Sequence, residues 1–313
     1  MRSSRSGNPT LESSPGTRRA PWQAWVLAAR VPTLAAAVSP VLVGTAAAAG
    51  AGIHHPLPAF AALLGAVAIQ IGTNYSNDAL DFLHGADTAQ RRGPTRVTAS
   101  GLLSPRQVLI GSYACFGAAA LAGAYLVALR GWPLLVVGLL SIGAGIAYTA
   151  NPIRLGYRGL GDLFVFIFFG VVAVVGSDYV QTGSVRPAAV LASIPVGLLA
   201  TAILVANNLR DVDTDRAAGK RTLAVRIGVP VTRAQYAVCL LGALLVPGIM
   251  RAAGLAGPWF WLPWLTAPLM GVLMADVFTR TDGSSLVRVL KRTARLLLIF
   301  SALFAIALAR GQA

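Results

Sequence analysis

Long apolar segments joined by short polar connections constrain the fold of this chain more than any other feature. Nine of them follow one another along the 313 residues, and most reach the ~20 residues that a helix needs to cross a bilayer. Their approximate limits are 22–50, 57–83, 107–129, 132–151, 160–179, 187–209, 233–252, 259–279 and 294–310. Because lipid cannot hydrogen-bond an open backbone, helices are the expected secondary structure. The sequence therefore predicts an all-α, polytopic membrane protein with nine transmembrane helices.

The composition separates this chain from soluble proteins. Only 12% of its residues are charged, whereas soluble domains contain ~25%. The net charge of +15 would suggest nucleic-acid binding in a soluble protein. In a membrane protein, basic residues in short loops set the orientation instead. We therefore expect the lipid bilayer, and no nucleic acid, as a partner.

The first 20 residues differ from the rest of the chain. They are rich in Ser, Pro, Gly and Arg, and such a segment cannot bury enough apolar surface to order itself. No apolar region directly follows a short basic start, so the segment does not read as a cleavable signal peptide. We expect a disordered cytoplasmic tail at residues 1–20 and one transmembrane domain at 21–313. Within that domain, Pro32 and Pro40 should bend the first helix.

The distribution of Lys and Arg predicts the orientation of the helices. When the N-terminus is placed in the cytoplasm and nine helices alternate, 22 basic residues fall on the inner side and four on the outer side. Basic residues accumulate in cytoplasmic loops, so this split supports both the count of nine and a cytoplasmic N-terminus. The four on the outer side are Arg130, Arg186, Arg251 and Arg310.

Two short acidic windows stand at the ends of the second and sixth segments. They are Asn74–Asp87 and Asn207–Thr222, and together they hold six of the 11 acidic residues. Charge at a membrane face is costly, so clustered carboxylates there indicate a site. In the predicted topology both windows lie on the cytoplasmic side, each after the second helix of a four-helix unit, with a ninth helix completing the bundle. We expect them to face each other across the mouth of one cavity.

The first window pairs two carboxylates on one helix face. Asp78 and Asp81 are three residues apart, a spacing at which helical side chains are neighbours. No basic residue lies within eight positions of either one. Asn74 and Asn77 add amide groups nearby, and Asp87 comes after the point where the helix should end. Together these groups favour a functional site. A solvated loop that only neutralises its own charge is the less favoured interpretation.

The second window repeats the pattern. Asp211 and Asp215 are four residues apart and share a helix face, whereas Asp213 should point elsewhere. The alternating charges around them also fit an ordinary solvated loop, and the spacing alone leaves that alternative open. Divalent cations prefer oxygen ligands, so we predict a Mg²⁺ site. The predicted catalytic carboxylates are Asp78, Asp81, Asp211 and Asp215, and the predicted metal ligands are these four and Asp87.

Basic side chains follow both windows. Mg²⁺ is typically held by one or two carboxylates plus substrate phosphates, and Lys or Arg can neutralise the charge on a departing diphosphate. The rule that sets helix orientation explains the positions of the arginines equally well. Lys220 is one of only two lysines in the chain, and its position favours a role in substrate binding. Asp162, by contrast, is expected to cap the fifth helix. The predicted substrate-binding residues are Asn74, Asn77, Arg30, Arg96, Tyr148, Arg154, Asn208 and Lys220.

Two motifs within the windows are similar to those of a known family. They are Asn77-Asp78-x-x-Asp81 and Asp211-x-x-x-Asp215. On these motifs the chain resembles the UbiA-type intramembrane aromatic prenyltransferases, over roughly residues 22–310. The segments GPTRVTASGLLSP, LGYRGLGDLFVFIFFG and NNLRDVDTDRAAGKRTLAVRIG are similar to the branch that acts on 1,4-dihydroxy-2-naphthoate in menaquinone biosynthesis.

The resemblance implies a UbiA-like bundle and a reaction. Mg²⁺ held by the two windows would bind the diphosphate of a polyprenyl diphosphate, and Arg and Lys would help the diphosphate to leave as an allylic cation forms. The ring of 1,4-dihydroxy-2-naphthoate would attack the cation, with loss of carbon dioxide, to give demethylmenaquinone. The prenyl tail would lie in the apolar bundle, where exclusion of water protects the cation.

Two alternatives stay open on the sequence. The first is a prenyltransferase for another aromatic acceptor, such as 4-hydroxybenzoate. The second is an ion-coupled membrane transporter, in which the acids would form an ion path. A transporter predicts charges near the middle of helices, whereas the two windows lie at helix ends beside basic loops.

Overall fold

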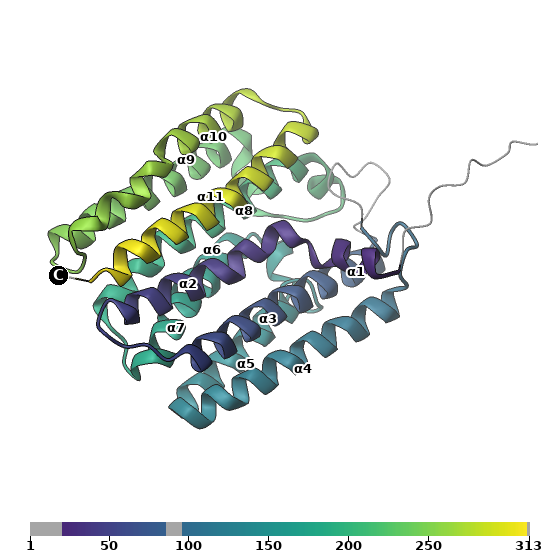
Figure 1. Cartoon of the computed structure of the whole chain (residues 1–313). Helices are drawn as coiled ribbons and strands as arrows, with labels where there is room; N and C mark the ends of the chain where they lie inside the picture. Colours follow the sequence, from purple (N-terminus) through teal and green to yellow (C-terminus); the bar gives the residue numbers. More distant parts are fainter. Residues whose placement is uncertain (1–20, 86–95, 312–313) are drawn as a thin grey trace, which may run out of the picture.

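The described part of the chain consists of helices that run roughly side by side (Figure 1). The computed structural model describes residues 21–85 and 96–311, and within them every regular element is a helix. In the view of Figure 1, α4 (Pro105–Arg130) and α5 (Trp132–Ala147) lie at one edge, and α9 (Leu223–Ala252) and α10 (Ala267–Thr279) lie at the opposite edge. The all-α prediction is confirmed.

Eight helical segments are long and apolar enough to cross a membrane. They are Val31–Ala49, Pro56–Leu83, Pro105–Arg130, Gly161–Thr182, Pro187–Ala217, Leu223–Ala252, Pro258–Thr279 and Gly283–Ala309. The predicted segment without such a span is the fourth, 132–151. It contains α5, which has only 16 residues and is therefore ~24 Å long, short of the ~30 Å hydrocarbon core. The chain is a multi-pass membrane protein, and the count of nine spanning helices is not confirmed within the described residues.

The first predicted segment is broken rather than gently bent. α1 (Pro21–Ala29) ends at Arg30, which has a left-handed backbone with φ of 51°, and the 3-10 helix η1 (Val31–Leu34) leads into α2 (Ala35–Ala49). Pro32 has no N–H to continue the helix, and a positive φ is uncommon outside glycine. Pro40 lies inside α2 without ending it.

Two hairpins carry the acidic windows. α3 (Pro56–Leu83) packs along α4, and α8 (Pro187–Ala217) packs along α9. The first helix of each hairpin ends in an acidic window, which agrees with the predicted pair of related units. The last helix, α11 (Gly283–Ala309), packs against both α2 and α8. Its partners thus come from both units.

The fifth predicted segment changes from α-helix to π-helix and back to α-helix. It consists of α6 (Gly161–Val165), the π-helix η3 (Phe166–Val172) and α7 (Ala173–Thr182). A Cβ added to Gly170 would lie 2.7 Å from the Cα of Gly197 on α8, so the two backbones touch where neither residue has a side chain. Two further 3-10 helices, η2 (Leu155–Arg158) and η4 (Pro258–Thr266), precede α6 and α10.

Candidate active site

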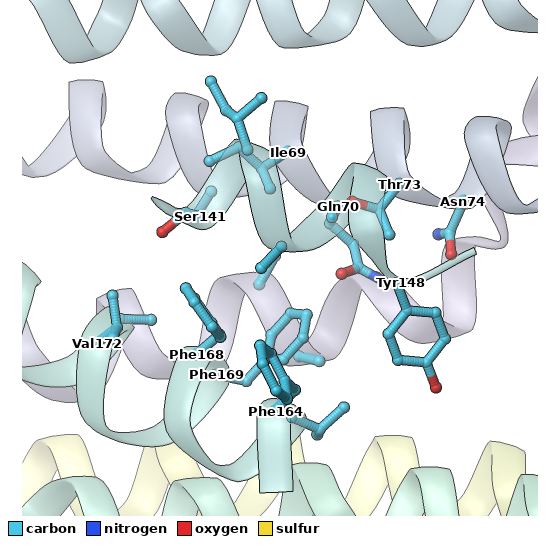
Figure 2. Close-up of a pocket in the computed structure, with 18 of the residues that line it drawn as sticks. Ile69, Gln70, Thr73, Asn74, Ser141, Tyr148, Phe164, Phe168, Phe169 and Val172 are labelled. Atoms are coloured by element: carbon cyan, nitrogen blue, oxygen red, sulfur yellow. The ribbon is translucent and has the colours of Figure 1, made fainter. Parts of the chain in front are cut away.

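A cavity of about 760 Å³ runs into the bundle and has two chemically different regions. Its apolar wall comes from α3, α4, α5 and the α6–η3–α7 segment. Figure 2 shows Tyr148 near Asn74, and Phe164, Phe168 and Val172 on a neighbouring wall. The charged lining residues are Arg30, Asp81, Arg96, Asp211, Asp215 and Lys220. Both acidic windows therefore contribute to one cavity, as predicted.

Asp81 is the point where four segments of the chain meet. It is buried in the last turn of α3. Its Oδ2 accepts from Arg96 Nη2 at 2.6 Å, and its Oδ1 accepts from the Tyr157 hydroxyl at 2.7 Å and from Lys220 Nζ at 3.3 Å. The Lys220 contact joins the first window to the second across the cavity mouth.

Asp78 has a different environment from Asp81. It is 1% exposed, and it is not among the residues that line the cavity. Its Oδ1 accepts from the backbone N–H of Thr98 at 3.1 Å and from the Thr98 hydroxyl at 2.5 Å, while its Oδ2 accepts from the N–H of Val97 at 3.4 Å. Asp78, a predicted metal ligand, thus faces this backbone and is not part of the cavity lining, and it anchors the loop that presents Arg96.

The second window places two of its three aspartates at the cavity. Asp211 and Asp215 line it, whereas the side chain of Asp213 is 68% exposed and lies 3.9 Å from Arg216. The carboxylate of Asp211 accepts from both Arg210 Nε and Arg210 Nη2. The helical spacing predicted this division correctly, because one turn of α8 separates the two aspartates that share a face.

The asparagines connect the site to neighbouring elements. Asn74 Nδ2 donates to the carbonyl of Ala29 at 2.9 Å and to Thr33 Oγ1 at 3.0 Å, so it ties α3 to the break after α1. Asn77 Oδ1 accepts from Thr149 Oγ1 at 2.5 Å. Asn208 is buried on α8 and lines the cavity. All three predicted asparagines thus lie at the site.

The remaining predicted residues divide into two groups. Arg30 and Tyr148 line the cavity. Arg154 is not among the lining residues, and its guanidinium lies over the ring of Tyr157, 5.2 Å from the centroid. Asp87 lies outside the described residues.

Tyr157 is a site residue that sequence reasoning missed. It lines the cavity, donates to Asp81 and lies under Lys220 Nζ, which is 4.6 Å from its ring centroid. The N–H of Arg221 also donates to its carbonyl at 2.9 Å. Its neighbours Arg154 and Arg158 marked the segment as basic, but the spacing within the segment gave no reason to select the tyrosine.

The structure also defines the environments of two titratable residues, Asp162 and His84. The expectation that Asp162 caps a helix is wrong: the N-cap of α6 is Leu160, and Asp162 Oδ1 accepts from Gln235 Nε2 on α9 at 3.1 Å. His84 follows the last residue of α3 and lies 3.3 Å from the Asn151 side chain. Burial, together with the nearby charges of Arg154 and Lys220, lowers the pKa of His84.

The donor set of the cavity fits a hard divalent cation. The described residues contain no group of three or more His, Cys, Asp or Glu side chains close enough to hold a metal alone. Mg²⁺, however, is usually bound by one or two carboxylates together with substrate phosphates. Asp81, Asp211 and Asp215 offer such carboxylates in one cavity. Beside them, Arg96 and Lys220 balance their charge.

The comparisons with known proteins assign the family. The profile of the UbiA prenyltransferase family matches residues 37–299, and the chain belongs to this family. Two solved structures have the same fold: a UbiA homolog from Aeropyrum pernix K1 (TM-score 0.69, 17% identity, 87% of this chain and 97% of that one), and one from Archaeoglobus fulgidus bound to GPP and Mg²⁺ (TM-score 0.61, 14% identity, 90% and 99%). The predicted UbiA-like bundle is thus confirmed.

Several similar curated proteins share one description. A 1,4-dihydroxy-2-naphthoate octaprenyltransferase of Mycobacterium tuberculosis is 40% identical over 289 residues, which cover 92% of this chain and 97% of that protein. The Escherichia coli protein of the same description is 36% identical over 296 residues, covering 93% and 96%. A similar Bacillus subtilis protein is 34% identical, covering 75% and 76%. These relatives favour the naphthoate branch over both alternatives.

Proposed function

We propose that this protein transfers a polyprenyl group from a polyprenyl diphosphate to 1,4-dihydroxy-2-naphthoate, in menaquinone biosynthesis. The curated relatives with that activity in their names match nearly the full chain. The observation that carries the proposal is the contact of Lys220 Nζ with Asp81 Oδ1 at 3.3 Å. This contact brings both acidic windows, together with two basic side chains, to the charged end of a cavity that is otherwise apolar.

The charged end suits the diphosphate of the donor. Arg96 and Lys220 are both held at the mouth by Asp81, where they can neutralise the charge that builds up on the leaving group. Mg²⁺ held at these carboxylates would supply further positive charge as a Lewis acid. Asp81, Asp211 and Asp215 are its proposed ligands from the cavity wall, and Asp78 supports them by fixing the loop of Arg96. The proposed ligand role of Asp87 rests on its position after Asp81.

The apolar region suits the prenyl tail and the acceptor ring. In the reaction the carbon–oxygen bond between the prenyl group and the diphosphate breaks, and the diphosphate keeps the electron pair. The electron-rich naphthoate ring forms the new carbon–carbon bond, and its carboxylate leaves as carbon dioxide. The product is the reduced form of demethylmenaquinone. Phe164, Phe168 and Tyr148 line the cavity and help to keep water from the allylic cation.

The mouth is proposed to open to the cytoplasm. Two of the three described basic residues that line the cavity, Arg96 and Lys220, lie in the loops after α3 and α8, and basic loops are retained on the cytoplasmic side. Both substrates are then available where they act, since the donor tail lies in the bilayer while the charged acceptor reaches the mouth from the aqueous side.

The direct test is an assay of the purified protein in detergent with dihydroxynaphthoate, an octaprenyl diphosphate and Mg²⁺. We expect a prenylated naphthoquinol, no product after chelation of divalent cations, and little product with 4-hydroxybenzoate. Replacing Asp78, Asp81, Asp211 or Asp215 by Ala should abolish turnover while the protein elutes as a folded species. Equal rates with both acceptors would reject the naphthoate assignment, and activity in all four variants would reject the site.

A further inference from the structure

Four basic side chains lie on one face at the beginning of α11. They are Arg288, Lys291, Arg292 and Arg295, and all four are exposed. At 100° per residue they fall within about 100° of the helix circumference. Leu290, on another face, lines the main cavity. This basic face is thus one helix thickness away from the proposed active site and points out of the bundle.

The same face becomes apolar further along the helix. Leu298 is 38% exposed, Ile299 48% and Ile306 49%, so the change from charge to hydrocarbon falls between Arg295 and Leu298. In a membrane-spanning helix this change marks the boundary between headgroups and acyl chains, where Lys and Arg place their charged ends. The basic face therefore lies at headgroup depth.

A recess of about 130 Å³ stands beside this face, between α10 and α11. It is lined by Asp276, Arg280, Ser285, Arg288 and Arg292. Arg292 Nη1 lies 3.2 Å from Asp276 Oδ2, Arg280 Nε lies 3.6 Å from Asp276 Oδ1, and Arg288 Nη2 donates to Ser285 Oγ at 2.6 Å. The one carboxylate in the lining thus leaves a net charge of +2 among these residues.

Asp282, a second carboxylate at the start of α11, already accepts hydrogen bonds from the helix. Asp282 is the N-cap of α11 and accepts from the N–H of Ser285 at 2.8 Å and from the Ser284 hydroxyl at 2.6 Å. These hydrogen bonds lower the pKa of Asp282, so it stays ionised and directed at the helix end. On the other side, Arg233 Nη2 of α9 donates to the carbonyl of Arg280 at 3.0 Å, which fixes the backbone beside the recess.

We propose that this recess binds the phosphodiester headgroup of an anionic bilayer phospholipid. Arginine binds phosphate oxygens through two parallel N–H groups, and basic pockets between transmembrane helices at a cytoplasmic surface attract anionic headgroups. Helix orientation alone accounts for positive charge in the loops, but not for a recess with three arginines, two of which lie on a helix face that continues as hydrocarbon. The proposal does not depend on the reaction in the main cavity.

Native mass spectrometry of the full-length protein in detergent tests the proposal. The protein is incubated with equal amounts of phosphatidylglycerol and phosphatidylcholine. We expect the wild type to retain phosphatidylglycerol with about tenfold preference, and the variant Arg288→Gln/Arg292→Gln to lose that preference. The control Arg251→Gln removes an exposed arginine at the opposite end of α9 and should behave as the wild type. Arg288→Lys/Arg292→Lys keeps the charge but not the paired N–H groups, and it should retain only part of the preference.

The outcomes separate this site from its alternatives. A wild type without preference, or a double glutamine variant that keeps it, would overturn the proposal. Displacement of the lipid by an equal concentration of inorganic diphosphate would assign the recess to the prenyl donor instead and overturn the phospholipid. If the double variant does not fold, Arg288→Gln alone carries the test, because it leaves the Arg292–Asp276 pair intact.

Discussion

At the scale of single residues, Lys220 connects the two halves of the site. Its side chain is 16% exposed, its ammonium contacts Asp81 and the ring of Tyr157, and its backbone N–H donates to the carbonyl of Asp215 at 2.8 Å. An ammonium is a compact charge on a flexible stem, so it can move from Asp81 to a diphosphate oxygen without rearrangement of the backbone.

Replacing Lys220 by Gln should therefore lower kcat/KM by about 100-fold, because one preorganised cation is lost at the leaving group. Lys291→Gln is the matched control, since Lys291 is the only other lysine and is exposed on α11. Steady-state rates of both variants, measured in the same detergent, check the prediction. Equal kinetics of the two variants would remove Lys220 from the site.

The second acidic window allows a comparison within one helix turn. Asp211→Asn and Asp215→Asn should each lower kcat by about 100-fold and raise the Mg²⁺ concentration needed for half-maximal rate, because each removes a proposed charged ligand from the cavity. Asp213→Asn should change neither quantity, since its carboxylate is exposed. Rates measured across a Mg²⁺ series test this. A loss in Asp213→Asn equal to the others would contradict the assignment by helix face.

At the scale of the elements, close backbone contacts between helices set the shape of the cavity. α2 packs against α7, and an added Cβ on Gly44 of α2 would meet the carbonyl oxygen of Val174 and lie 2.7 Å from Cβ of Ser177. Small residues at such crossings let transmembrane helices approach closely. The π-helix η3 meets α8 in the same way, through Gly170 and Gly197.

Gly44→Val should thus destabilise the protein by about 3 kcal/mol, because the neighbouring backbone cannot move away as a side chain could. Gly117→Val is the control, because on α4 nothing lies within 4 Å of an added Cβ. Thermal unfolding in detergent, followed by loss of the monodisperse elution peak, measures the difference. A melting temperature of Gly44→Val equal to that of the control would show that α2 and α7 have room to separate.

At the scale of the whole molecule, the cavity combines a charged mouth with an apolar interior. Gly138 on α5 lines this interior, and nothing lies within 4 Å of an added Cβ there. Substitution can therefore fill the cavity without straining the bundle.

Gly138→Leu should lower kcat/KM for an octaprenyl donor by about tenfold more than for a geranyl donor, because the longer tail needs more of the interior. Gly117→Leu, on a surface of α4 outside the cavity lining, should leave both rates unchanged. Competition between the two donors in one reaction gives the ratio directly. An equal loss with both donors would place the long tail elsewhere.

The orientation of the bundle can be tested by labelling. In a variant without Cys115 and Cys239, Ser184→Cys lies in the exposed turn between α7 and α8, and Ser100→Cys lies in the exposed loop before α4. With the mouth in the cytoplasm, an impermeant maleimide should label Ser184→Cys in intact cells and Ser100→Cys only after lysis. The reverse pattern would invert the proposed topology.

The sequence by itself determined the helical class, most of the membrane spans and the aspartates that share a helix face. These follow from chain-local physics: the length of apolar runs against the thickness of a bilayer, and the angular spacing of residues on a helix. The prediction was least accurate where one of these rules met a local exception, as at Arg30, where the first helix breaks, and at α5, whose helix is shorter than its apolar segment.

Only the tertiary structure decided which groups meet at the site. Asp78 and Asp81 are equivalent by spacing, yet one binds the backbone of Val97 and Thr98 and the other faces the cavity with Tyr157 and Lys220. Asp81 and Lys220 are separated by 139 positions, and contacts of that range depend on how α3, η2 and the end of α8 pack. The periodicity of a single helix does not contain that information. Periodicity gives the direction in which a side chain points, but not which residue of another helix or loop it meets there.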